Sequence, residues 1–185
     1  MMISTLLEAE TWQDSKLLPE LSQRMTPMQL RVLRVTSVLT NFLEQKYGLK
    51  LDVQLHDQCM STASEVEAGL LGIEPHERCL RRKVSLKSRG EVMFDAESVL
   101  PLDILPVELM AELEAGKRPL ANLLSDRGLL LSRSGLSVTQ VKSVGVYQHC
   151  WARRSVLHSH SGAKALVTEV FHDAIWRKLD YLVNR

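Results

Sequence analysis

Two segments with the alternation of β-strands each place one charged residue among apolar neighbours. A strand directs alternate side chains to opposite faces. In Cys79–Lys87, Arg82 therefore shares a face with Leu80, Val84 and Leu86. In Lys164–Phe171, Glu169 shares a face with Ala165, Val167 and Phe171. A charge in an apolar interior is costly unless it has a partner or a ligand. The two residues therefore predict a closed pocket for a small acid that carries a hydroxyl or a labile proton.

A second interpretation of the same pattern is a buried ion pair between Arg82 and Glu169 with no ligand, since buried charges are usually paired. The other charges of these strands are expected in solvent. Arg81 falls on the polar face of its strand, and Glu97 falls on the polar face of Glu91–Leu100 with Glu91 and Asp95. The basic cluster Arg78–Lys83 is accordingly interpreted as a solvated strand edge rather than a phosphate-binding track.

Composition favours an ordinary globular domain. The 185 residues are 45% hydrophobic and 24% charged, and they are expected to form one domain over residues 1–185. A net charge of +1 predicts no general attraction to nucleic acid or to a membrane surface. No run approaches the roughly 18 apolar residues of a membrane span, and Met1–Glu10 lacks the features of a signal peptide. A cytoplasmic location is therefore expected.

The three cysteines, Cys59, Cys79 and Cys150, have no CxxC spacing. Neither a disulfide framework nor a zinc site is indicated. The sequence does not determine the oligomeric state, for which a monomer is slightly favoured.

Helical patterns dominate the first quarter of the chain. Residues 1–24 are interpreted as an N-terminal helical extension. Thr26-Pro27 starts a helix, with a hydroxyl cap followed by proline at the first helical position. Apolar residues then recur at helical spacing as far as Tyr47, and Gly48 supplies the stop. The pair Thr36-Ser37 is the point at which this helix could break in two.

Strand patterns dominate the rest. Two hairpins are predicted, one around Ser88-Arg89-Gly90 and one around Ser161-Gly162. Hairpins pair antiparallel, and the predicted helices do not alternate with strands as regular βαβ units. The predicted class is α+β, an antiparallel sheet of about six strands with helices packed against it. The expected strands are Leu49–Leu55, Cys79–Lys87, Glu91–Leu100, Leu129–Val141, Trp151–His160 and Lys164–Phe171.

Several short motifs occur in the order and spacing of a known family. The end of the chain, with Trp151-Ala-Arg-Arg-Ser155, Ser161-Gly162 and Leu166–Phe171, resembles the end of the chorismate pyruvate-lyase (4-hydroxybenzoate synthase) family. The resemblance extends over roughly Met25 to Phe171. It also includes Thr26–Leu33, Leu39–Glu44, Leu80–Leu86, Gly90-Glu91, Ala96–Pro101 and Gly116–Leu120. One departure is Thr36-Ser37-Val38, where the wider chorismate-lyase-like group usually has Asn/Asp-Gly-Thr.

This resemblance implies a six-stranded antiparallel sheet with helices on one side and a buried ligand cavity. The implied reaction converts chorismate to 4-hydroxybenzoate and pyruvate without a cofactor. By resemblance, Arg82 grips the ring carboxylate and Glu169 meets the ring hydroxyl, and these two are the expected catalytic residues. Backbone amides of Leu120 and Leu39 would assist the ring carboxylate. Arg154, or its neighbour Arg153, would meet the enolpyruvyl carboxylate.

The role of Glu169 is open at this point, because it could orient the hydroxyl or take part in proton transfer. Burial should raise the pKa of Glu169, and any nearby arginine should counter that rise.

Two other functions fit the same sequence. The effector-binding domains of GntR-type regulators resemble this fold and bind small acids without chemistry. Such a regulator carries a winged helix-turn-helix ahead of the domain, for which Met1–Met25 is too short, so a standalone sensor of small acids is the form that this alternative takes. The other alternative is a chorismate-processing enzyme that gives a different product, such as 3-hydroxybenzoate.

Overall fold

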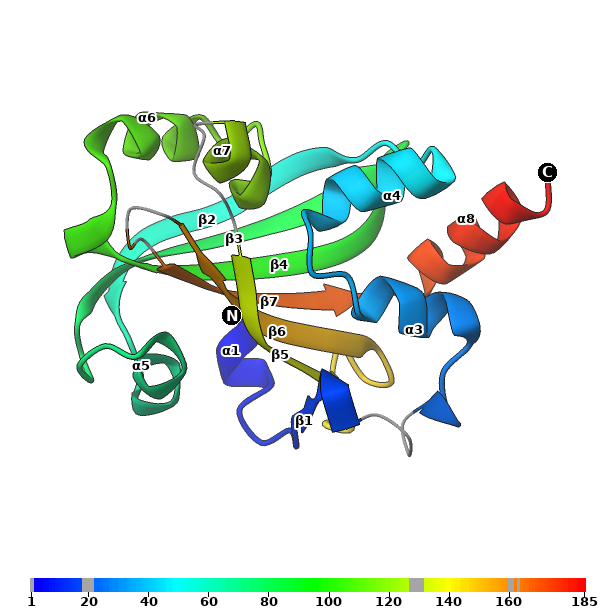
Figure 1. The fold of residues 1–185 in the computed structure, drawn as a ribbon, viewed down its shortest axis with the longest axis horizontal. Coiled ribbons are helices and arrows are strands. Elements are labelled where there is room, and N and C mark those ends of the chain that lie inside the picture. The colour runs from blue at the N-terminus through cyan, green and yellow to red at the C-terminus, as the bar shows by residue number, and fades with distance from the viewer. Residues whose placement is uncertain (1, 18–21, 127–131, 160–161, 163) are drawn as a thin grey trace.

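The structure is a computed structural model that describes residues 2–17, 22–126, 132–159, 162 and 164–185. Seven strands form one antiparallel sheet in the order β1-β5-β6-β7-β4-β3-β2 (Figure 1). The α+β class is thus confirmed. The strands are β1 (Gln13–Asp14), β2 (Asp52–Thr62), β3 (Arg78–Ser88), β4 (Glu91–Pro101), β5 (Ser132–Gln140), β6 (Trp151–His158) and β7 (Lys164–Phe171).

The strand count is one higher than predicted because the N-terminal segment contributes β1, which pairs with Val138 and Ser137 of β5. In the described part of segment 1–24, which was predicted to be helical, helical residues occur in α1 (Ile3–Leu6), in the 3₁₀ turn η1 (Ser15–Leu17) and at Ser22; residues 1 and 18–21 lie outside the described part. Two residues of β-structure are too short to produce a pattern that a sequence reading can detect.

Both hairpins pair as predicted. In the first, Ser88 pairs with Glu91, and Arg89 and Gly90 form the turn with φ of 51° and 84°. Positive φ at both positions is what a two-residue hairpin turn requires, and glycine adopts it without strain. In the second hairpin Arg153 lies opposite Glu169. Ser161, in its predicted turn, lies outside the described residues.

Five helices cover the face of the sheet that carries Arg82 and Glu169, called the front face here (Figure 1). Side chains of three of them, α3, α4 and α8, form one core with Phe94 and Phe171, while α6 and α7 pack with Leu80 and Leu100. The chain breaks between α3 and α4 at Thr36-Ser37, as predicted. The helices are α3 (Pro27–Leu33), α4 (Leu39–Tyr47), α6 (Val107–Ala115), α7 (Leu120–Asp126) and α8 (Asp173–Val183), and a 3₁₀ turn, η2 (Leu102–Ile104), precedes α6.

The opposite face, called the back face, carries Arg81 and Arg154 and is also covered. Helix α1 packs there with Ala152 and Val170, and α5 (Glu65–Leu71) packs with Val99, Val156 and Leu166. The prediction that helices lie on one side only is therefore wrong. The separate expectation, drawn from strand alternation, that Arg81 and Glu97 lie in solvent is also wrong, because both side chains are buried. The cluster Arg78–Lys83 lies on a strand inside the sheet, not at its edge.

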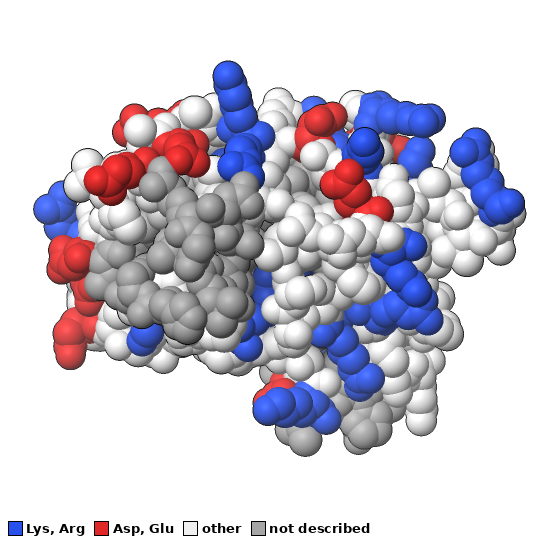
Figure 2. Space-filling model, turned by 45° about the horizontal axis from the view of Figure 1, so that its top comes forward, with Lys and Arg blue, Asp and Glu red and all other residues white. Residues whose placement is uncertain are grey.

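The surface charge and the cysteines do not indicate a particular function. In the view of Figure 2, Lys and Arg side chains are interleaved with Asp and Glu, so this face carries charges of both signs. Cys59, Cys79 and Cys150 are free thiols. No helix in the described part of the chain is long and apolar enough to cross a membrane.

Candidate active site

A small cavity, the front cavity, lies between the front face and the first turns of α4 and α7. Its volume is about 50 Å³. Four of the five predicted site residues meet in its wall, namely Arg82, Glu169, Leu39 and Leu120. They come from β3, β7, α4 and α7, four elements that are distant in sequence. Apolar side chains fill most of the remaining wall, including Val84, Leu86, Phe94, Leu157 and Val167.

The guanidinium of Arg82 has no carboxylate partner among the described residues. The side chain is 1% exposed, its Nη2 donates to the carbonyl of Arg118 at 3.0 Å, and its Nε is buried without a partner. Burial lowers the pKa of Arg82 to about 10, so the group stays charged at neutral pH. A buried, charged and incompletely bonded guanidinium is suited to bind an anion.

Glu169 forms its ion pair with Arg153 rather than with Arg82. Nε of Arg153 donates to Oε2 of Glu169 at 2.5 Å, and Nη2 lies 3.3 Å from Oε1. The alternative of an Arg82–Glu169 ion pair without a ligand is therefore wrong. Arg153 is fully buried and also donates from Nη1 to the carbonyl of Val35 at 2.7 Å, just beyond the end of α3. The pair fixes the Glu169 carboxylate and the α3–α4 break together.

Glu169 is ionised in this site. Burial alone would raise the pKa of Glu169, but the charges of Arg153 and Arg133, with the hydrogen bond from Arg153, lower it below its usual value. Of the two opposing effects expected on the pKa of Glu169, that of the arginines is therefore larger than that of burial. An ionised carboxylate accepts hydrogen bonds and cannot donate a proton.

Arg133 is a second cation in the cavity wall that the sequence reading missed. Its Nη1 donates to Oγ of Ser155 at 2.6 Å, while its Nε is buried without a partner. Burial lowers the pKa of Arg133 to about 10, with Glu169 raising it and Arg153 lowering it further. Val138 packs on the front face. Arg133 is five residues before it, an odd number, so regular strand alternation would place Arg133 on the back face. A bulge between Ser134 and Ser137 shifts this register and brings Arg133 to the front.

Arg154 does not belong to this cavity. Consecutive residues of a strand point to opposite faces, and Arg153 occupies the front face, so Arg154 lies on the back face. There its guanidinium stacks over the ring of Trp12, 4.3 Å from the centroid. The assignment of the enolpyruvyl carboxylate to Arg154 is therefore corrected. Arg133, and not Arg154, is the additional cation beside Arg82.

Side-chain hydrogen bonds connect the two helices that border the front cavity. Thr40 Oγ1 donates to Oδ1 of Asn122 at 2.7 Å, and Nδ2 of Asn122 donates to Oδ1 of Asn41 at 2.8 Å. These bonds join the first turn of α4 to the first turn of α7. A volume of about 50 Å³ holds little more than one water molecule, whose share of the liquid is about 30 Å³. A ring acid does not fit in this volume, so the cavity wall must move to admit one.

The described residues contain no group of three His, Cys, Asp or Glu side chains that could hold a metal ion. The chemistry available at the front cavity is that of two guanidiniums without a carboxylate partner among the described residues, one ionised carboxylate and a mostly apolar wall.

The fold is shared with ligand-binding domains of transcriptional regulators. The effector domain of PhnF from Mycobacterium smegmatis superposes with a TM-score of 0.58 at 16% identity, covering 75% of this chain and 90% of that domain. The ligand-binding domain of a GntR-family regulator from Bordetella bronchiseptica gives 0.53 at 12% identity, covering 66% and 85%. At these identities the likeness concerns the fold alone.

Sequence comparison points to one family. No curated protein sequence matches the chain. Residues 6–180, nearly the whole chain, match the chorismate lyase family. The chain therefore belongs to the chorismate lyase family.

Proposed function

We propose that this protein is a chorismate pyruvate-lyase, which eliminates pyruvate from chorismate to give 4-hydroxybenzoate. One observation carries the proposal. The guanidiniums of Arg82 and Arg133 both line the front cavity, and neither has a carboxylate partner in an ion pair among the described residues. Chorismate bears two carboxylates, one on the ring and one on the enolpyruvyl group. Membership of the chorismate lyase family supports the same reaction.

Each cation receives one carboxylate in this proposal. Arg82, beside α7, takes the ring carboxylate, and Arg133 takes the enolpyruvyl carboxylate. The first N–H groups of a helix have no partner inside that helix. Leu39 and Leu120 are the first residues of α4 and α7, so their N–H groups are suited to complete the binding of the ring carboxylate.

Glu169 then accepts the hydrogen bond of the ring hydroxyl. Its lowered pKa makes it a weak base and a permanent acceptor, so we assign it the role of orienting the hydroxyl rather than that of removing the ring proton. The reaction breaks the C4–H bond and the C3–O bond, and the electron pair of C4–H forms the new ring double bond. The electron pair of the C3–O bond stays on oxygen, and the methylene carbon of the enolpyruvyl group takes up the proton released from C4, so pyruvate leaves and no proton is gained or lost overall. Aromatisation drives the step.

A sensor of small acids is the alternative function. The same cavity could bind an acid without converting it, and the fold is one that effector domains of regulators use. A lyase that gives a different hydroxybenzoate is the third possibility. The three functions are distinguished by what happens to chorismate: the first gives 4-hydroxybenzoate, the sensor gives no product, and the third gives another hydroxybenzoate.

The test is to incubate the purified chain with chorismate and to quantify aromatic product and pyruvate. We expect 4-hydroxybenzoate and pyruvate in equal amounts. Binding of chorismate without pyruvate release would establish the sensor, and another hydroxybenzoate isomer would establish the third possibility.

Variants then test the site. Hydrogen bonds to charged groups contribute about 1.5–3 kcal/mol, so Arg82→Gln and Arg133→Gln should each lower kcat/KM by about ten-fold to 150-fold. The matched control is Arg34→Gln, an exposed arginine outside the front cavity, which should leave kcat/KM unchanged. Normal activity of a folded Arg82→Gln protein would discard the site assignment.

A further inference from the structure

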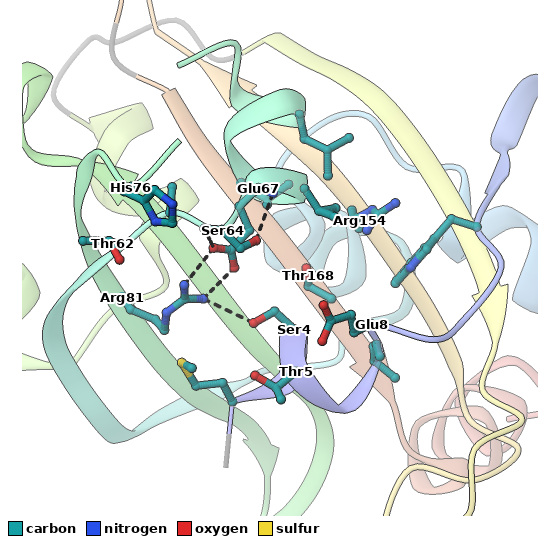
Figure 3. Close-up of a pocket in the computed structure, with 17 residues that line it drawn as sticks. Ser4, Thr5, Glu8, Thr62, Ser64, Glu67, His76, Arg81, Arg154 and Thr168 are labelled. Carbon is teal, nitrogen blue, oxygen red and sulfur yellow. Dashed lines mark hydrogen bonds and ion pairs between the residues drawn. The ribbon is translucent and has the colours of Figure 1, made fainter. Parts of the chain in front are cut away.

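The back face contains a larger cavity that the proposed reaction does not use. It lies between α1, α5 and strands β6 and β7, and its volume is about 260 Å³ (Figure 3). We call it the back cavity. Among the side chains that line it are Ser4, Thr5, Glu8, Trp12, Arg154 and Thr168. A cavity of this size admits a small organic molecule, since an engineered apolar cavity of about 150 Å³ binds benzene.

Two arginines line the back cavity, and they differ in their partners. Arg81 is bound by two buried carboxylates, with Nη1 2.8 Å from Oε1 of Glu67 and 2.7 Å from Oε1 of Glu97. Arg154 has no carboxylate partner among the described residues, and its Nε is buried without a hydrogen bond. Its guanidinium stacks on the ring of Trp12. Burial lowers the pKa of Arg154, which reflects a cation that has lost water without gaining a counter-ion.

The surroundings of Arg154 are both polar and apolar. Thr168 pairs with Arg154 in the β6–β7 register, and both side chains line the back cavity. Figure 3 shows Arg154 on one side of the cavity and Arg81 on the other, with Thr168 between them. Apolar side chains at the wall remain open to solvent, with Met2 41%, Val66 55% and Leu70 37% exposed. A ligand here would meet the cation of Arg154, the hydroxyl of Thr168 among other hydroxyls of the wall, and an apolar rim.

The charge of the wall limits the ligand further. Glu8 also lines the back cavity and is exposed. Its carboxylate opposes a second negative charge on the ligand, which disfavours dianions and phosphates. The aromatic ring of Trp12 against the guanidinium favours a flat apolar body.

We propose that the back cavity binds a small monocarboxylic acid with an apolar or aromatic body, whose carboxylate bonds to Arg154 and whose body lies against Trp12 and the apolar rim. The back cavity is separate from the front cavity, because Arg153 and Arg154 are neighbours on β6 that point to opposite faces. The proposal holds whether or not the front cavity converts chorismate.

The test is a titration of the full chain with benzoate, followed by ¹⁵N-resolved NMR. The indole N–H of Trp12 and the amide of Thr168 report on the back cavity, and the amides of Leu39 and Leu120 report on the front cavity. We call the Trp12 and Thr168 signals the back set and the Leu39 and Leu120 signals the front set. Both sets should shift on addition of benzoate, with separate titration midpoints. Arg154→Gln should weaken binding at the back set by about ten-fold or more, because hydrogen bonds to charged groups contribute about 1.5–3 kcal/mol. The front set should keep its midpoint.

Three controls complete the design. Arg78→Gln removes an exposed arginine of β3 and should change neither midpoint. Arg82→Gln should weaken the front set and leave the back set unchanged. Thr168→Val keeps the Arg154–Trp12 contact and should weaken the back set, which tests the site even if Arg154→Gln does not fold.

Two results would overturn the proposal. One is the absence of shifts at Trp12 and Thr168 in the wild-type chain at millimolar benzoate. The other is equal affinity of the back set in Arg154→Gln and Arg78→Gln. Stronger binding of inorganic phosphate than of benzoate at the same residues would refute the stated ligand class.

Discussion

Replacing Arg81 by methionine should destabilise the fold strongly while leaving the front cavity untouched. Arg81 is the shared cation of Glu67 and Glu97, whose side chains are 4% and 2% exposed. Glu97 also accepts the backbone N–H of Ile3 at 2.6 Å, which links this network to the first turn of α1. Methionine fills much of the same volume but leaves two carboxylates buried without a cation.

The magnitude follows from the burial. Removing one partner of a buried ion pair costs about 3–5 kcal/mol, because the other charge stays desolvated. For a chain of this length 1 kcal/mol corresponds to about 2–4 °C in Tm. The variant should therefore unfold about 6–20 °C below the wild type. The matched control is Arg177→Met, which breaks an exposed pair with Glu91 at 3.4 Å and should cost at most about 1 kcal/mol.

The stability difference between the wild type and Arg81→Met should also change with pH in a defined direction. Burial alone would raise the pKa of Glu67, but hydrogen bonds from Arg81, Ser64 and Ser4 and the charge of Arg81 lower it in the folded protein. Its contribution is present above the unfolded pKa and is lost as pH falls through the folded pKa. Without Arg81, burial raises the folded pKa, so the variant is penalised at neutral pH and relieved on acidification. The stability gap should therefore narrow from pH 7 to pH 4.

The assay is urea unfolding followed by circular dichroism at several pH values, on wild type, Arg81→Met and Arg177→Met. Equal losses of stability in the two variants, or a gap that widens toward pH 4, would refute the reasoning that Arg81 neutralises two buried carboxylates.

Three further outcomes are expected. Glu169→Gln leaves the fully buried Arg153 without a counter-charge and should lower the free energy of unfolding by up to about 3–5 kcal/mol, although the amide oxygen still accepts from Arg153. In the folded fraction it should lower kcat/KM for chorismate by about ten-fold or more, measured by pyruvate release. Asn122→Ala removes both bonds between α4 and α7 and should speed the association of 4-hydroxybenzoate in stopped-flow experiments. Asp95→Asn should flatten the acid limb of the stability curve. Burial raises the pKa of Asp95, but hydrogen bonds from His172, Ser85 and Tyr147 bring it down to about 2. Its stabilising contribution is thus present above about pH 4 and is lost as pH falls toward 2.

Strand alternation identified correctly which of these charged residues share a face, but it could not identify their partners or what covers each face. It placed Arg82 and Glu169 on one face, where the structure has them. It also placed Arg81 and Glu97 together on the other face, which is correct, and then assigned that face to solvent. Alternation shows which side chains share a face and does not show what covers it. The cover includes α1, whose four residues are too few to produce a helical period.

Shifts in strand register are the second reason why the site could not be predicted fully from the sequence. The bulge in β5 reverses the parity of Arg133 relative to Val138, and no residue type in Ser132–Gln140 other than Gly135 marks the shift. Choosing between Arg153 and Arg154 needed the register of β6 against β7, in which Glu169 lies opposite Arg153. Each of these facts depends on pairing between strands that are distant in sequence.

Two arginine doublets, Arg81-Arg82 on β3 and Arg153-Arg154 on β6, supply each face of the sheet with two cations. On each face one cation is neutralised: Arg153 by Glu169 in front, and Arg81 by Glu67 and Glu97 behind. The other cation, Arg82 in front and Arg154 behind, lines a cavity without a carboxylate partner among the described residues. A buried guanidinium costs free energy unless an anion compensates it. Arg82 is fully buried, whereas Arg154 is half-buried and stacks on Trp12, so the argument that makes Arg82 a ligand-binding group applies to Arg154 with less force. If titration finds an anion at only one of the two, partner-free arginine in this sheet is not by itself a sign of a ligand.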